Sequence, residues 1–355
     1  MKTYIHSAGV VSPHISNQFD QTGTESIPQV QNGHLFCHEP DYKEFINPMV
    51  SRRMSRMVKM GIYAAKTCLT RAGIEMPDAI ITGTGLGCIE DTEKFLISVI
   101  ENDEKLLNPT PFIQSTHNTV SSQISLFLKC HGYNVTYSHR GFSFESALLD
   151  SVMMISEGMA SSVLTGGVDE LTQHSFHLQT RLGIWNNSQD GQSQILSTKT
   201  RGNLAGEGAV FFLLSDKPCD ENNVMIHSPS IIHETADEKS IIKLTKHFLE
   251  SKNMNFADID VFMAGYGGDA SGDKLYDVLS NEVFSNSAVA FYKHLCGDYM
   301  TSSAFAMALG NQIIKSQKLP DIINVNRKHI SKINNVLIYN HFLNMNHCFL
   351  LLQNV

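Results

Sequence analysis

The segment Ser162-Val163-Leu164-Thr165-Gly166-Gly167 is a short apolar run that ends in two glycines. We infer the fold by working outward from this segment. A helical pattern covers about residues 142–157 before it, and another apolar run, residues 134–137, precedes that helix. Apolar runs this short are typical of buried strands when helical segments separate them. The alternation of strand and helix continues along the chain, and it predicts an α/β architecture with largely buried sheets.

Two halves repeat this alternation. The first is expected to hold strands at 3–12, 79–82, 134–137, 162–167 and 209–214, and helices at 49–73, 91–103, 115–130 and 142–157. The second opens near residue 224, with strands near 224–231, 260–264, 335–340 and 347–353, and helices at 240–252, 272–280 and 300–315. We therefore predict two units, residues 1–220 and 221–355.

Composition narrows the class of protein. The 355 residues are 42% hydrophobic and carry a formal net charge of −8, which allows a large core and argues against nucleic acid as a partner. No apolar run approaches the length of about 18 residues that a membrane-spanning helix needs, and the first residues lack a signal-peptide pattern. Seven cysteines without a CxxC pair suit a reduced, cytoplasmic protein, and we expect no metal and no cofactor.

Several short motifs follow one another in an order that resembles the β-ketoacyl-acyl-carrier-protein synthases. They are Ala8-Gly9-Val10-Val11-Ser12-Pro13, Arg52-Arg53-Met54-Ser55-Arg56, Gly83-Thr84-Gly85-Leu86-Gly87, Asn118-Thr119-Val120-Ser121-Ser122-Gln123-Ile124, Gly166-Gly167-Val168-Asp169-Glu170 and Gly206-Glu207-Gly208-Ala209. The resemblance implies a thiolase-like fold of five layers, αβαβα, built from two similar halves and normally dimeric. It also implies the family's reaction, a decarboxylative condensation of acyl units that acyl carrier protein delivers.

The family's nucleophile is missing. In the family a cysteine at a tight turn carries the acyl chain, since a thiolate is a good nucleophile and a thioester a reactive acyl store. A Gly-Gly strand end follows that cysteine by 25 and 26 residues, and counting back from Gly166 and Gly167 without a gap reaches Gly141. No cysteine lies within ten residues of Gly141, so covalent catalysis at this point is chemically impossible.

The two histidines that promote decarboxylation in the family are also replaced. Tyr266 is the predicted substitute for the first, and its phenol, with a pKa near 10, is a poor proton shuttle at neutral pH. The family's lysine precedes the second histidine by five residues, which identifies Lys293 and places Asp298 where the histidine belongs. His294 lies four residues too early to replace it without a shift of register. We expect Lys293 to be structural, paired with Asp298 or Glu207.

The family's late Gly-Phe-Gly-Gly loop falls at about residues 343–346, which read Leu-Asn-Met-Asn. Residues with Cβ atoms replace three glycines, so we expect a loop that needs positive φ to take another path here. Together with Gly141, Tyr266 and Asp298, this fourth departure indicates a site that has lost its condensation chemistry.

A chain-length-factor-like subunit is the function that these departures favour. Such proteins share the synthase fold, lack the cysteine and shape the acyl tunnel of an active ketosynthase partner, and the present chain looks most like those of aryl polyene and flexirubin pathways. Tunnel and dimer-interface residues are expected at Phe112, Gln114, Thr116 and Asn118. The basic residues Arg52, Arg53 and Arg56 are expected to dock acyl carrier protein, the alternative being a solvated helix face.

Two other interpretations stay open at this point. One is altered chemistry, an acyltransferase or hydrolase acting on acyl carrier protein thioesters through Ser143 and His139, although spacing shows neither a positioned base nor an oxyanion hole. The competing interpretation of this segment is structural: Arg140 and Glu145 are expected to form an ion pair that fills the pocket left by the missing cysteine. The other is a homodimeric binding or scaffold protein without a synthase partner.

Overall fold

A computed structural model describes residues 2–14, 27–186, 195, 200–219 and 223–355. The first half contributes the strands β1 (Thr3–Val11), β2 (Ala79–Gly83), β3 (Tyr133–Tyr137), β4 (Ser162–Asp169) and β5 (Gly208–Ser215). Its helices are α1 (Pro48–Ser51), α2 (Arg56–Ala72), α3 (Ile89–Glu101), α4 (Pro109–Gln114), α5 (Thr119–Leu128), α6 (Ser143–Ser156) and α7 (Gln173–Arg181).

The second half contributes β6 (Val224–Ile226), β7 (Ser230–His233), β8 (Val261–Ala264), β9 (Ala288–Phe291), β10 (Asn335–Phe342) and β11 (Asn346–Asn354). Its helices are α8 (Glu238–Glu250), α9 (Asp273–Val278), α10 (Lys293–Cys296) and α11 (Ser303–Ser316). The strands form one sheet in the order β3-β2-β4-β5-β1-β6-β11-β10-β8-β9, and β7 pairs with β11. The halves therefore join through β1 and β6.

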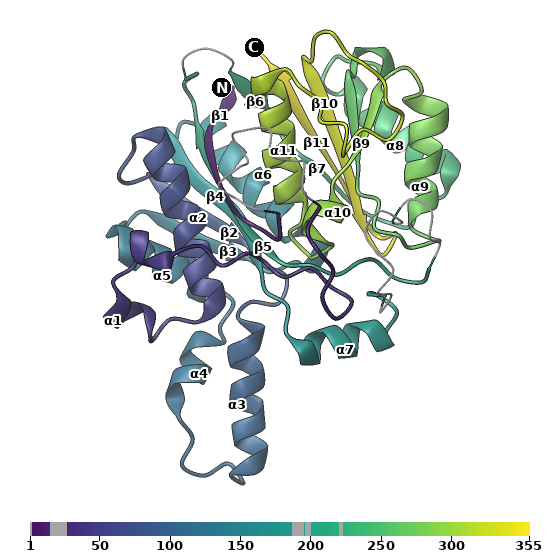
Figure 1. Cartoon of the computed structure of the whole chain (residues 1–355). Helices are drawn as coiled ribbons and strands as arrows, with labels where there is room; N and C mark the ends of the chain where they lie inside the picture. Colours follow the sequence, from purple (N-terminus) through teal and green to yellow (C-terminus); the bar gives the residue numbers. More distant parts are fainter. Residues whose placement is uncertain (1, 15–26, 187–194, 196–199, 220–222) are drawn as a thin grey trace.

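Alternate side chains of each central strand face different helices, which creates the layers. On β5, Val210, Phe212 and Leu214 belong to a core that contains α6 and α11 and also takes in β10 and β11. The intervening side chains of β5 pack instead with α2 and α5. The other face of β10 and β11 packs with α8 and α9. Helices thus lie between and outside the two groups of strands (Figure 1), which confirms the predicted thiolase-like αβαβα fold.

The structure corrects several predicted elements. The single helix predicted at 49–73 is two helices, because Ser55 adopts an extended backbone and its side chain accepts a hydrogen bond from the Val58 N–H, starting α2 there. The helix predicted from 115 begins at Thr119, and the strand predicted at 224–231 is two short strands, β6 and β7. The prediction missed α4, α7, α10 and β9, all of which are short.

Candidate functional site

The turn before α6 holds the residue predicted to replace the nucleophile. β3 ends at Tyr137, a short 3₁₀ turn covers Arg140–Phe142, and α6 begins at Ser143. Gly141 is buried in this turn. A Cβ atom added to it would lie 2.4 Å from the Cβ and 2.8 Å from the Cγ of Phe342, at the end of β10. Carbon atoms normally meet at about 3.5–4.0 Å, so Phe342 occupies the space that any side chain at position 141 would need.

The structure does not form a serine–histidine pair at this turn. The Ser143 hydroxyl is fully buried, donates to the Arg140 carbonyl oxygen at 2.7 Å and accepts from the His139 backbone N–H at 2.9 Å. The imidazole of His139 instead contacts the Ser146 hydroxyl, Nδ1 to Oγ, at 3.1 Å. Ser143 therefore caps a turn, and among the residues that the structure describes no base contacts its hydroxyl.

Glu145, on the first turn of α6, is fully buried and does not pair with Arg140, which is exposed. Its carboxylate accepts a hydrogen bond from the Ser303 hydroxyl at 2.5 Å instead. Burial raises the pKa of Glu145 to about 7, and the positive charge of Lys293 lowers it in part. The prediction that Arg140 and Glu145 form an ion pair that fills this pocket is therefore wrong, because Glu145 is buried and Arg140 is exposed.

Lys293 and Asp298 form a buried ion pair. The Lys293 Nζ lies 2.9 Å from Asp298 Oδ1, and both residues are almost fully buried. The second oxygen, Oδ2, accepts from the Asn203 side-chain amide at 2.6 Å, and the Ser302 hydroxyl donates to Oδ1 at 3.2 Å. Three side chains thus donate to this carboxylate and hold it in place as the partner of Lys293.

His294, next to Lys293, does not replace the missing histidine. Its ring stacks on Phe291, with centroids 3.9 Å apart. Burial lowers its pKa to about 3, so the imidazole is neutral at physiological pH. Glu207, the other partner considered for Lys293, binds Arg56 instead.

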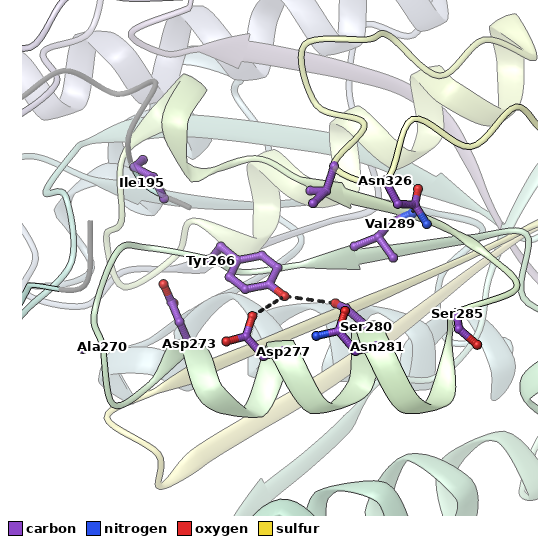
Figure 2. Close-up of a pocket in the computed structure, with 11 residues that line it drawn as sticks. Ile195, Tyr266, Ala270, Asp273, Asp277, Ser280, Asn281, Ser285, Val289 and Asn326 are labelled. Atoms are coloured by element: carbon purple, nitrogen blue, oxygen red, sulfur yellow. Dashed lines mark hydrogen bonds between the residues drawn. The ribbon is translucent and has the colours of Figure 1, made fainter. Parts of the chain in front are cut away.

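Tyr266 turns away from this ion pair. Its hydroxyl donates to Asp277 Oδ1 and accepts from the Ser280 hydroxyl, each at 3.1 Å, and it lines a cavity of about 360 Å³ beside α9 (Figure 2). The glycines on either side of it face elsewhere. A Cβ at Gly267 would meet the Asn203 amide at 2.4 Å, and one at Gly265 would meet Asn340 Oδ1 at 2.4 Å and the Tyr276 hydroxyl at 2.8 Å.

At the end of β8, the space beside Gly267 is therefore filled by the side chain of Asn203, just as the space beside Gly141 is filled by Phe342. The structure brings Lys293 and Asp298 together and places Tyr266 with the α9 side chains. Sequence reasoning missed Phe342, Asn203, Asn340 and Tyr276, which fill the space. Three glycines, at 141, 265 and 267, were the available signal, because a buried glycine often marks close approach of another group.

The loop at 343–346 is the turn of the hairpin between β10 and β11, and it takes positive φ despite its side chains. Leu343 has φ 55° and Asn344 has φ 50°. The side chain of Asn344 exchanges hydrogen bonds with both the N–H and the carbonyl oxygen of Ala236, which holds it in this conformation. Two residues with Cβ atoms thus adopt positive φ in this turn, and these tertiary contacts offset the strain.

Arg52 and Arg53 are exposed, whereas the side chain of Arg56 is partly buried and forms ion pairs. Its guanidinium binds both carboxylate oxygens of the fully buried Glu207, at 2.6 and 2.7 Å, and its Nε reaches Glu39 at 2.5 Å. Glu207 also accepts from the backbone N–H groups of Cys37 and Leu171. Arg56 is thus neither a solvated cation nor a free docking group.

The helices α3 and α4 form an arm that extends from the body of the molecule (Figure 1). Phe95 and Phe112 contact each other across it, with ring centroids 5.1 Å apart. Six large apolar side chains of the arm are exposed, and Leu106 is fully so: Leu96, Ile97, Ile100, Leu106, Phe112 and Ile113. We call these six residues the arm patch. Gln114 does not join it, because its side chain binds the backbone of Ser55 and Arg53, and Thr116 and Asn118 lie exposed before α5.

Two sequence comparisons give different results, a match to a family profile and no match to a curated protein. Residues 19–218 match the family profile described as beta-ketoacyl synthase, N-terminal domain. No curated protein matches the sequence significantly. Among the described residues, no helix is long and apolar enough to cross a membrane.

Solved structures with the same fold cover all of this chain at low sequence identity. The ishigamide ketosynthase/chain length factor is 16% identical with a TM-score of 0.81, and 99% of that chain is covered. A β-ketoacyl synthase from Burkholderia phymatum STM815 is 16% identical with a TM-score of 0.79 and 99% covered. A ketosynthase in complex with its chain length factor from Xenorhabdus doucetiae is 14% identical with a TM-score of 0.77 and 98% covered.

Proposed function

Because the chain belongs to the β-ketoacyl synthase family, we propose that it is a non-catalytic chain length factor, the partner subunit of an active ketosynthase. In this role it pairs with the ketosynthase, helps to shape its acyl tunnel, and takes part in polyketide, aryl polyene or fatty-acid-type chain elongation on acyl carrier protein. The observation that carries the proposal is the contact between Gly141 and Phe342. It leaves no nucleophile and no room for one.

The remaining polar groups of this centre support the same conclusion. Condensation needs hydrogen-bond donors aimed at a developing enolate oxygen. Here Asp298 stands beside Lys293 as a buried anion, which would repel both the enolate and a malonyl carboxylate. Lys293 is occupied by this aspartate, so the pair offers no free donor for a developing negative charge.

The altered-catalysis alternative finds little support. A serine nucleophile needs a base within hydrogen-bond reach of its hydroxyl. The Ser143 hydroxyl donates to a backbone carbonyl oxygen, and the imidazole of His139 lies with Ser146. Incubation with acyl carrier protein thioesters followed by intact-mass measurement is therefore expected to leave Ser143 unmodified. An adduct on Ser143 would revive this alternative.

The arm patch supports assembly with another subunit. Six exposed large apolar side chains on one projecting arm are unusual for a soluble monomer, and groups of this kind often mark protein interfaces. β3 lies at one end of the strand order, so its outer edge is open to pairing with a strand of another chain. Leu126 on α5 is a further exposed apolar side chain of the first half. We keep the division into residues 1–220 and 221–355 as part of the proposal, with the partner surface on the first unit.

Co-purification tests the proposal. The chain is co-expressed with a ketosynthase that has an intact cysteine and histidines, and the pair is separated by size-exclusion chromatography with light scattering. We expect a 1:1 heterodimer, lost in Ile100→Asp and Leu106→Asp and retained in Met76→Asp, a matched exposed apolar residue at the opposite end of β2. Elution of the chain alone, or as a homodimer in the presence of the ketosynthase, would refute the partner role and favour the scaffold alternative.

A further inference from the structure

A surface groove of about 720 Å³ lies along the segment between α11 and β10, residues 317–334. Three of its apolar lining residues are half-buried and pack against the core that contains α6 and α11: Leu319, Ile322 and Ile330. Lys318, Arg327 and Lys328 line it as well, and Asp321 is the only acidic residue among the described residues of the lining. The groove, which we call the basic groove, therefore combines apolar side chains with positive charge.

The positive charges of the basic groove are not neutralised within the chain. None of the ion pairs among the residues that the structure describes includes Lys318, Arg327 or Lys328. The Lys328 ammonium donates only to a neutral group, the Ser285 carbonyl oxygen, at 3.3 Å. Like charges that share one groove repel one another, although the chain as a whole carries a net charge of −8. An acidic occupant would remove this repulsion.

The basic groove is held in shape by hydrogen bonds of its own segment. The Gln317 side chain donates to the Ile333 carbonyl oxygen at 2.8 Å and accepts from the Ile333 N–H at 2.9 Å. Asn326 binds the backbone at the start of β9 in the same way. Residues 323–325 pair with β9, the last strand in the sheet order, and so close its outer edge. An occupant therefore finds a preformed groove and binds through side chains rather than as an added strand.

The tip of the arm, residues 100–106, has the complementary chemistry. Its apolar side chains Ile100 and Leu106 are both exposed. Three acidic side chains of the tip are exposed together with one lysine, Lys105: Glu101, Asp103 and Glu104. In the part of the chain that the structure describes, none of these three acids forms an ion pair. We call residues 100–106 the arm tip.

The backbone of the arm tip points to a binding role independently of its charge. Asp103, Glu104 and Leu106 have φ of 46°, 62° and 54°, in the left-handed region that residues with Cβ atoms rarely adopt. Backbone strain of this kind concentrates at binding and switch sites, where another contact makes use of it. At Leu106 the strained backbone also presents a completely exposed apolar side chain to solvent. A partner that covers this leucine accounts for both features.

We propose that the arm tip of one copy of the chain docks in the basic groove of a second copy. The three acids of the tip face the three cations of the groove, and Leu106 enters the apolar lining. The two surfaces lie at opposite ends of the molecule: the arm projects from one end, and residue 334 binds the backbone of Asn354 beside the C-terminus at the other (Figure 1). Two copies therefore cannot exchange both contacts, and association is head-to-tail.

The contact has a consequence for assembly with a ketosynthase. Ile100 and Leu106 belong both to the arm patch and to the arm tip, so a ketosynthase that binds the arm displaces the neighbouring copy. The head-to-tail contact thus covers the arm only while the ketosynthase is absent. This consequence rests on the proposed function, whereas the self-association itself does not.

Light scattering of the full chain alone, over a series of protein concentrations, tests the contact. We expect the average mass to rise with concentration and to fall when sodium chloride is added, because salt screens exposed charges. Arg327→Glu and Leu106→Asp should each weaken association by about 10-fold or more. Lys239→Glu, which reverses the charge of an exposed lysine on α8, is the matched control and should associate as the wild type does. Lys318→Glu takes the place of Arg327→Glu if circular dichroism shows that Arg327→Glu does not fold.

Mixing two variants decides whether a tip in a groove makes the contact. Leu106→Asp keeps an intact groove and Arg327→Glu keeps an intact tip, so their equimolar mixture should form a dimer and nothing larger at concentrations where each variant alone is monomeric. A wild-type chain that stays monomeric at every concentration, association that survives both changes, or a mixture without a dimer would overturn the proposal. Pairing with a ketosynthase is measured separately, so its loss alone would overturn the proposed function and leave this contact standing.

Discussion

Replacing Gly141 with alanine tests whether Phe342 fills the vacated nucleophile site. The new Cβ would lie 2.4 Å from the Phe342 Cβ, more than about 1 Å inside normal carbon contact. Overpacking of this kind costs about 1–3 kcal/mol, and the upper end applies because the Phe342 Cβ is fixed to the backbone of β10. Loss of backbone freedom in the unfolded chain returns about 0.4–1 kcal/mol. We expect the free energy of unfolding to fall by about 2 kcal/mol.

Urea unfolding followed by circular dichroism measures this cost in three backgrounds. In Phe342→Gly the clash is removed, so Gly141→Ala should become neutral or slightly stabilising, with a coupling of about 2–3 kcal/mol. Phe342→Ala keeps the clashing Cβ and should keep most of the cost. Leu343→Gly, a change at the exposed neighbouring residue, is the matched control and should leave the cost unaltered. A cost below about 0.5 kcal/mol, or the same cost with and without Phe342, would refute the reasoning.

The remaining predictions concern buried charges. Asp298→Ala leaves Lys293 buried without its partner and should lower the free energy of unfolding by about 3–5 kcal/mol, whereas Lys293→Met with Asp298→Leu should cost much less; equal losses in urea unfolding would contradict the ion-pair account. Arg56→Gln should lower Tm strongly, because it leaves the buried Glu207 without its cationic partner. Arg52→Gln and Arg53→Gln should leave Tm unchanged but weaken carrier-protein binding in a salt-dependent way. Carrier-protein binding that is insensitive to both of these changes would exclude this docking face. Burial raises the pKa of Glu170 to about 8 from an ordinary value near 4.5, so the folded state holds a proton that the unfolded state releases, and stability should fall as pH rises from about 4.5 to 8. Glu170→Gln should flatten that slope in urea unfolding measured at pH 5.5 and pH 8, and an unchanged slope would count against it.

The sequence predicted the fold class and, through the family resemblance, the position of the missing nucleophile. Strand and helix periods are local properties, so the alternation of short apolar runs with helical segments was sufficient to predict an α/β architecture, and the resemblance to the β-ketoacyl synthases added the αβαβα layers. The spacing between Gly141 and Gly166 could be counted because one helix and one strand of regular length separate them. The pairing of Lys293 with Asp298 was equally accessible, since the two residues lie five positions apart and end on one short turn.

Only the tertiary structure decided what fills the site. Phe342 reaches Gly141 because the register of β10 on β8 sets where β10 ends, and no local pattern encodes a contact between residues so far apart in the sequence. Arg56 and Glu207, 151 positions apart, form their ion pair for the same kind of reason, so one of the three arginines in a basic motif that suggests a docking surface serves a structural pair instead. Tyr266 was assigned from its place in the sequence, but successive side chains of an extended segment point to opposite sides, and a difference of one position decides which side a group faces.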